Sequence, residues 1–161
     1  MMQTDVKAAY VKSSGILVTP LRTRLKGCVV TSGTSSLRNV AACDPVSVVS
    51  GTYSQTGTTA TITITNHGLV NGDRVFVDFL TGTSRDGVYV ITYIDANSFS
   101  VTTVNSVSTS GNVNVYPEIY MEIDTYSTVG LSVLIPGQGI LFPNGIFFGT
   151  GPSVTAMVYY G

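Results

Sequence analysis

The chain contains a single histidine, His67, within the stretch TNHGLVNGDRVFV (65–77). A histidine can serve as a general base when it has a nucleophile to activate and a carboxylate to orient its ring, and no local motif supplies either partner. Gly68, Asn71 and Gly72 instead offer the positive φ angles that a tight corner needs. The residues therefore predict a structural corner between two strands.

Four aspartates in the same region are the other candidates for chemistry, because paired carboxylates can hydrolyse glycosides or bind calcium. Their spacing matches no calcium-binding loop. Asp73 opens a predicted strand, and Asp86 and Asp95 lie in predicted turns, where an aspartate bonds to nearby backbone. Turn chemistry is the favoured interpretation. The four residues are Asp73, Asp78, Asp86 and Asp95.

Other signatures of catalysis are missing from the sequence. It has no GxSxG elbow, no phosphate-binding loop and no HExxH helix. Cys28 and Cys43 are not in CxxC spacing, and one histidine does not complete a zinc site with them. Two reduced thiols are the favoured interpretation, and a disulfide is the alternative. We therefore expect no enzyme activity, no catalytic residue, no cofactor and no metal.

The elements that carry these residues are predicted to be strands. In TTATITITN (58–66), Ala60, Ile62 and Ile64 alternate with threonines, which is typical of a strand with one buried and one solvated face. The same alternation recurs between turn residues, and five short strands in one segment suggest a small barrel or sandwich. The four further strands are predicted at 73–80, 87–94, 98–104 and 112–116.

The rest of the chain also has the pattern of β-strands, without a sustained helical period. These strands could close a two-sheet sandwich of the jelly-roll type, so the fold class is all-β. We place an inserted β module at 51–116 in a scaffold formed by 1–50 and 117–161, since insertions succeed at loop tips. The scaffold strands are predicted at 6–12, 15–19, 23–30, 46–50, 118–124, 129–135, 145–149 and 153–160.

Composition narrows the classes of function. The chain has 161 residues, of which 43 % are hydrophobic and only 11 % charged, and its net charge is −1. Such a charge draws it neither to nucleic acid nor to an anionic membrane, and no apolar run reaches the ~20 residues of a membrane span. The start MMQTDVKAAY lacks the order of a signal peptide. We expect a soluble protein made in a cytoplasm, with part of its surface covered by partners.

Two stretches, LRTRLK (21–26) and EIYMEID (118–124), carry like charges on alternate positions, with Tyr120 among the acidic ones, and a strand places these positions on one face. In the second stretch, Ile119, Met121 and Ile123 are expected to face the core. Both stripes could be solvated faces, where ion pairs contribute roughly 0–1 kcal/mol. Alternatively, one stripe docks on a neighbouring subunit. The hypothetical interface comprises Arg22, Arg24 and Lys26 of the basic stripe, and Glu118, Glu122 and Asp124 of the acidic stripe.

Two segments, RLKGCVVTSGTSS (24–36) and LIPGQGILFPNGIFFGTGPSVTAMVYYG (134–161), resemble a family of short phage virion structural proteins. In that family a basic strand leads into a valine-rich strand, and the chain closes with a strand ending in Tyr-Gly. This sequence departs from the family by carrying 51–116 where a short hairpin is usual. The module itself is similar to a small β repeat with an HGLxxGD corner found in phage tail and fibre proteins.

The resemblances imply a non-enzymatic virion component, made in the host bacterial cytoplasm. We expect it to decorate or cement the capsid as a homo-oligomer, most simply a trimer, bound to the major capsid protein or other virion subunits. The alternative is a tail, adaptor or fibre-associated protein, with a host-surface-binding module that could use Tyr53, Tyr89 and Tyr93. No nucleic acid and no membrane is expected as a partner.

Overall fold

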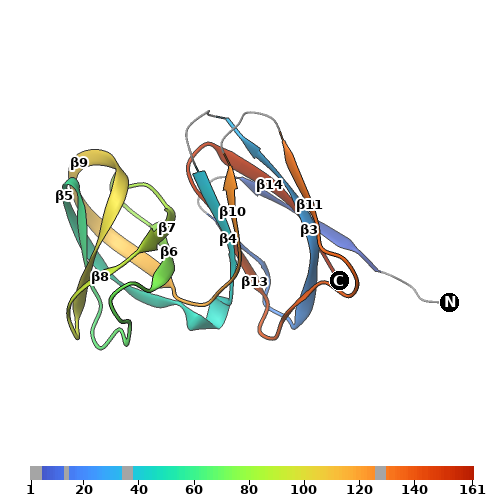
Figure 1. Ribbon diagram of the computed structural model, residues 1–161, viewed down its shortest axis with the longest axis horizontal. Helices are drawn as coiled ribbons and strands as arrows, with labels where there is room; N and C mark the ends of the chain where they lie inside the picture. The colour runs from blue at the N-terminus through green and yellow to red at the C-terminus, as the bar shows by residue number, and fades with distance from the viewer. Residues whose placement is uncertain (1–4, 13–14, 34–37, 126–129) are drawn as a thin grey trace.

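Residues 5–12, 15–33, 38–125 and 130–161 are described by a computed structural model (Figure 1). The chain is all-β, as predicted, with one short 3-10 helix, η1 (Pro45–Ser47). The strands are β1 (Lys7–Lys12), β2 (Ile16–Thr19), β3 (Thr23–Ser32), β4 (Arg38–Cys43), β5 (Val49–Thr63), β6 (Arg74–Phe79), β7 (Gly87–Val90), β8 (Thr92–Asp95), β9 (Ser98–Tyr116), β10 (Ile119–Thr125), β11 (Leu131–Leu134), β12 (Ile140–Phe142), β13 (Ile146–Thr150) and β14 (Val154–Tyr160).

Two antiparallel sheets form the scaffold. The outer sheet has the order β1-β14-β3-β11, with β12 also paired to β3, and the middle sheet has the order β10-β4-β13-β2. Figure 1 shows the middle sheet between the outer sheet and the module. Alternate residues of the two sheets fill one core, which the period-2 pattern requires. Its fully buried members include Val11, Leu25, Cys28, Val30, Val40, Phe142, Phe148 and Val158.

The connectivity of the scaffold is that of a jelly roll. The first four strands alternate between the sheets, with β1 and β3 in the outer sheet and β2 and β4 in the middle sheet. The chain returns through β10, β11, β13 and β14, and β14 inserts between β1 and β3. Strands from the first half of the scaffold therefore pair with strands from the second half, as in a jelly roll built from two Greek keys. The predicted sandwich is therefore confirmed, and the module interrupts it between the fourth and fifth scaffold strands.

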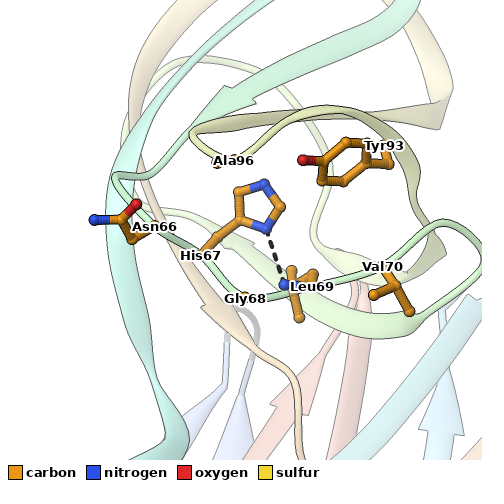
Figure 2. Close-up of a pocket in the computed structure, with 7 residues that line it drawn as sticks. All are labelled: Asn66, His67, Gly68, Leu69, Val70, Tyr93 and Ala96. Atoms are coloured by element: carbon orange, nitrogen blue, oxygen red, sulfur yellow. Dashed lines mark hydrogen bonds between the residues drawn. The ribbon is translucent and has the colours of Figure 1, made fainter.

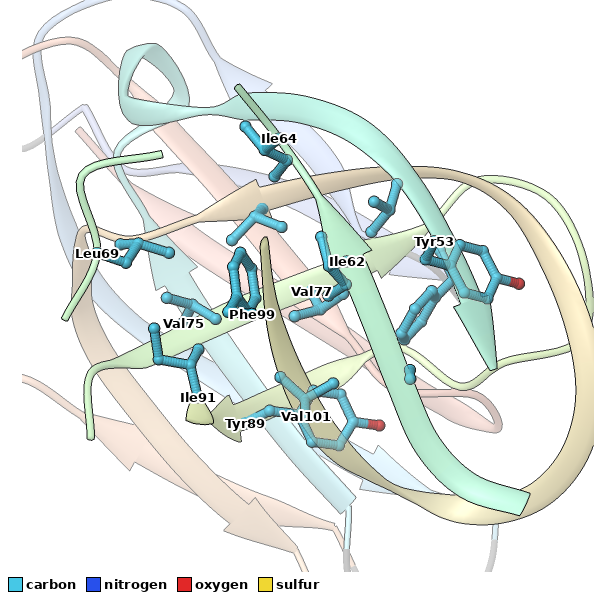
Figure 3. Close-up of a cluster of buried hydrophobic side chains, with 14 residues drawn as sticks. Tyr53, Ile62, Ile64, Leu69, Val75, Val77, Tyr89, Ile91, Phe99 and Val101 are labelled. Carbon is cyan, nitrogen blue, oxygen red and sulfur yellow. The ribbon is translucent and has the colours of Figure 1, made fainter. Parts of the chain in front are cut away.

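The module is one folded sheet with the order β5-β9-β6-β7, and β8 pairs with β9. The first part of β9 pairs with β8 and the second part with β6, so the sheet folds over its own core (Figure 3). The sheet does not close into a barrel, so of the two predicted forms only the sandwich-like one remains. Buried members of this core include Tyr53, Ile62, Val75, Val77, Tyr89, Ile91, Phe99 and Val113.

A buried amide fixes the bend of the module's long strands. The Nε2 group of Gln55 donates to Gly57 O at 2.8 Å and to Asn105 O at 2.7 Å. The same group donates to the Thr103 hydroxyl at 2.8 Å, and the Ser84 hydroxyl donates to the Gln55 carbonyl. A buried amide is costly unless it is bonded. The network therefore holds the bend of β5, where the register with β9 shifts after Gly57.

A separate apolar cluster joins the module to the middle sheet. Phe76 of β6 is fully buried, and the rings of Tyr116 and Phe147 stack across the junction with centroids 3.9 Å apart. Gly149 allows this close approach, because a Cβ there would stand 2.4 Å from the Phe76 ring. The two parts are therefore in tight contact. The cluster contains Ala41, Cys43, Phe76, Val88, Tyr116 and Phe147.

The strand predictions differ from the structure in several places. β4 and β12 were not predicted, and β5 begins at Val49, well before the strand predicted at 58–66. Residue 129, the first of the run predicted at 129–135, lies outside the described residues. The run predicted at 46–50 begins with η1, because Pro45 starts a helical turn and the carboxylate of Asp44 accepts from the Val46 N–H at 2.9 Å. The run at 87–94 is broken at Ile91, where pairing passes from β6 to β9. The strands predicted at 98–104 and 112–116 are one strand, β9.

The module sheet begins at Val49 and ends at Tyr116, close to the predicted limits. Its core cluster draws only on residues within those limits, whereas the scaffold cluster draws only on residues outside them. Whether 51–116 and the scaffold of 1–50 plus 117–161 are separate folding units stays a prediction.

Candidate functional site

His67 lies in the corner between β5 and β6, and its ring is held from both sides (Figure 2). Its Nδ1 accepts from the Leu69 N–H at 3.1 Å, so Nε2 carries the proton and donates to Asp95 O at 2.9 Å. The ring also packs edge-on against Phe99, with centroids 5.1 Å apart. Neither nitrogen is available for proton transfer. The corner interpretation of His67 is therefore confirmed.

The backbone of the corner differs from the prediction at one residue. Gly68 and Gly72 have φ values of 70° and 94°, as expected. The third positive φ belongs to Asn66 rather than Asn71. Asn71 contributes through its side chain, which accepts from the Tyr93 N–H at 3.1 Å.

A depression of about 380 Å³ lies beside this corner, bordered by the rings of His67 and Tyr93 (Figure 2). Its titratable lining groups are the His67 imidazole, whose two nitrogens are both hydrogen-bonded, and the Tyr93 phenol. Among the tyrosines proposed for host binding, Tyr93 is exposed, whereas Tyr53 and Tyr89 are buried. The lining residues are Asn66, His67, Gly68, Leu69, Val70, Tyr93 and Ala96.

Three of the four module aspartates have the predicted turn role. Asp73 accepts from the Val70 N–H at 2.9 Å, Asp86 from the Phe79 N–H at 2.8 Å, and Asp95 from the Asn97 N–H at 2.7 Å. Asp78 is different, because it is buried within β6 on the face that meets the middle sheet. Burial, followed by the nearby charge of Asp86, raises the pKa of Asp78 to about 7.

Neither a metal centre nor a membrane span is found in the part of the chain that the structure describes. In those residues, no three His, Cys, Asp or Glu side chains gather closely enough to hold a metal ion. No helix there is long and apolar enough to cross a membrane. Cys28 and Cys43 are free and buried, Cys28 in the scaffold core and Cys43 in the junction cluster, and burial raises the pKa of the Cys28 thiol to about 11. Neither thiol is poised to react.

The predicted basic stripe lies on the outer sheet. Arg24 and Lys26 project from the same side of β3, since Arg24 donates to Gly139 O at 3.3 Å and Lys26 to Gln138 O at 3.0 Å. Arg22 is exposed and precedes β3. Arg24 and Lys26 therefore lie together over the loop that contains Gln138 and Gly139, whereas Arg22 lies just before β3.

The predicted acidic stripe lies on the middle sheet and is divided by a bulge. The register of β10 against β4 shifts between Ile119 and Met121, so Ile119 packs in the junction cluster and Met121 in the scaffold core. The prediction that Ile119 faces the scaffold core is therefore wrong. The exposed Glu118 precedes β10 and falls out of alternation with Glu122 and Asp124.

The remaining acidic residues have partners within the chain. Glu122 forms an ion pair with Arg74 of β6, a contact that the sequence pattern did not indicate. The Asn39 amide donates to Glu122 at 3.3 Å and to Asp124 at 2.6 Å. The two stripes lie on different sheets and do not meet within one chain. Their role in an interface between copies stays a prediction.

The structure also reveals a surface that alternation alone did not single out, the outward face of the outer sheet. Tyr10, Met157 and Val29 form one row across β1, β14 and β3 in register. Tyr159 and Leu134 flank Gly27 in the next row, and Leu134 is 84 % exposed. No described element covers these side chains. We refer to Tyr10, Val29, Leu134, Met157 and Tyr159, with Arg24 and Lys26 beside them, as the outer face.

Charge is segregated along the chain, and a count by segment shows it. Residues 44–124 contain eight of the nine acidic residues and two of the eight basic ones, which gives a net charge of −6. The remaining residues carry +5. The five strands of the outer sheet contain four Lys or Arg and no Asp or Glu. The outer sheet and the module lie at opposite ends of the molecule (Figure 1). The module, 49–116, contains four Asp and two Arg, a net charge of −2, so the outer sheet is basic and the module is weakly acidic.

No protein-family model matches the chain, and no curated protein matches its sequence. Among solved structures, the chain is similar to "Phage phi92 endosialidase", with a TM-score of 0.32 and 19 % sequence identity. The match covers 81 % of this chain and 20 % of that one, so this chain spans about a fifth of that protein's length. Similarity of this degree says nothing about activity or assembly.

Proposed function

We propose that this protein is a non-enzymatic structural component of a phage particle, which decorates or cements the capsid as a homotrimer. Its partners are copies of itself and the major capsid protein or another virion subunit. Arg22, Arg24 and Lys26 take part in these contacts. The protein is made in the host cytoplasm and resides in the virion.

The observation that carries this proposal is the outer face. Leu134 is 84 % and Tyr10 is 57 % exposed, and both lie on a sheet whose outward side no described element covers. Contiguous apolar patches on a soluble protein mark interaction sites. Such a face on a sheet suits a protein that lies flat against a neighbour, as a cement protein must.

Fold and composition agree with this function. Eight-stranded jelly rolls recur in viral capsids and in lectins. That is an analogy, because one fold hosts many functions. The low content of charged residues, 11 %, is further support, since charged residues are depleted at the centre of protein interfaces.

A location in the tail is the second candidate, and the module favours it. The module has a core of its own. The His67 corner, between β5 and β6, resembles the corner of the β repeat found in tail and fibre proteins. In that location the module would project from the particle, and Tyr93 at the corner could meet the host surface.

Counting copies separates the two candidates. Quantitative mass spectrometry of purified particles of the phage that encodes the chain would compare its peptides with those of the major capsid protein. Abundance comparable to the capsid protein supports decoration or cementing. Abundance at the level of known tail subunits supports the tail, and absence from purified particles refutes both.

A further inference from the structure

A trimer with ring symmetry requires two different surfaces on each chain. In a cyclic trimer the contacts are head-to-tail, so one patch of each copy meets another patch of the next copy. The two patches must be complementary to each other and too far apart to meet within one chain. The outer face is one such patch, because it is apolar at its centre and basic at its side.

The second patch lies at the other end of the scaffold, where the middle sheet faces the module. A cleft of about 530 Å³ opens there, with Asn39 and Asp124 on one wall and strands β7, β8 and β9 on the other. Val90 is 50 % and Val104 is 60 % exposed in this cleft. The module side of the cleft thus combines exposed valines with Arg74, and the scaffold side carries Asp124.

Arg74 and Asp124 are the charged side chains that line the cleft. Arg74 and Glu122 are paired with each other and offset one another. Asp124 is exposed and accepts from the neutral Asn39 amide. The surrounding segment 44–124 carries −6 against +5 for the rest of the chain, so the field around the cleft is negative.

We infer that the outer face of one copy docks in the cleft between the middle sheet and the module of the next copy. This inference rests on the homo-oligomer of the proposed function and identifies its interface. Tyr10 and Leu134 would cover Val90 and Val104, and Arg24 and Lys26 would approach Asp124. Charge complementarity favours this register over contact between two outer faces, which would bring like charges together.

The test uses one variant of each surface in the full chain. The outer-face variant carries Arg24→Glu and Lys26→Glu, and the cleft variant carries Val90→Arg and Val104→Arg. A second outer-face variant, Leu134→Glu, leaves the hydrogen bonds of Arg24 and Lys26 to the loop intact. Val46→Arg is the matched control, because Val46 is an exposed valine on η1, away from both surfaces.

Light scattering after size-exclusion chromatography should show a trimer for the wild type and for the control. Each variant alone should fall about threefold in mass, to a monomer that still unfolds cooperatively. Mixing the outer-face and cleft variants should give heterodimers of about twice the monomer mass, because the intact outer face of the cleft variant docks in the intact cleft of the outer-face variant.

The remaining outcomes would contradict the proposed interface. Unchanged mass in the variants, or variants that stay monomeric on mixing, overturns it, and a wild-type monomer overturns it together with the proposed homotrimer. Association of the mixed variants supports the interface even where the copy number in purified particles places the protein in the tail. The proposed interface and the proposed capsid location can therefore fail independently.

Discussion

Replacing Asp78 by Asn should make the stability of the protein less dependent on pH. The side chain is only 7 % exposed, on the face of β6 that packs against the middle sheet, and the titratable groups near it are Asp86 and Tyr116. Burial, followed by the charge of Asp86, raises its pKa to about 7 from an ordinary value of 3.8. Asn keeps the shape and removes the charge.

The direction of the pH effect follows from proton binding. Between the two pKa values the folded state holds the Asp78 proton and the unfolded state has lost it. The contribution of Asp78 to the unfolding free energy is therefore most favourable at acidic pH and is lost as the pH rises from 3.8 to about 7. The full difference corresponds to about 4 kcal/mol, and partial access of water to the junction reduces it to about 2 kcal/mol.

Urea denaturation of both proteins between about pH 4.5 and about pH 8 measures this effect. Relative to Asp78→Asn, the wild type should lose about 2 kcal/mol of unfolding free energy across that range. Asp95→Asn is the control, because hydrogen bonding from the Asn97 backbone lowers the pKa of the exposed Asp95. The difference in unfolding free energy between Asp95→Asn and the wild type should stay constant across this pH range. Parallel profiles of unfolding free energy against pH for the wild type and Asp78→Asn would refute the conclusion that the Asp78 carboxyl is buried and uncharged.

Four further predictions concern the junction, the corner, the C-terminal strand and the module. Phe76→Ala should cost roughly 3–5 kcal/mol of unfolding free energy in urea, because the fully buried ring leaves a cavity at the junction; a loss below about 1 kcal/mol would contradict this packing. His67→Ala should cost about 1–3 kcal/mol in the same assay, because it leaves the Leu69 N–H and Asp95 O unpaired; an unchanged midpoint would show that the corner does not need the ring. Deleting 158–161 should abolish soluble expression, because Val158 is fully buried in the scaffold core; a soluble, cooperatively melting truncation would disprove it. An isolated 51–116 segment should give a dispersed NMR spectrum, because its core is local; a disordered spectrum would show that it depends on the scaffold.

Local patterns predicted most of the strands and the corner, but they did not indicate β4 or β12. The alternation in 58–66 predicted a strand, since burial of one face requires period 2 whatever the partner strand is. Gly68 and Gly72 predicted the turn around His67, because positive φ is a property of the residue itself.

Only the tertiary structure decided what each strand faces and which charges meet. The bulge after Ile119 turns that side chain from the scaffold core to the junction, and alternation has no means of showing an extra residue. Glu122 pairs with Arg74, 48 residues away, and Asp78 is buried because the module packs on the middle sheet. Sequence spacing determines which residues share a face of a strand, whereas the partner of that face depends on contacts between segments far apart in the chain.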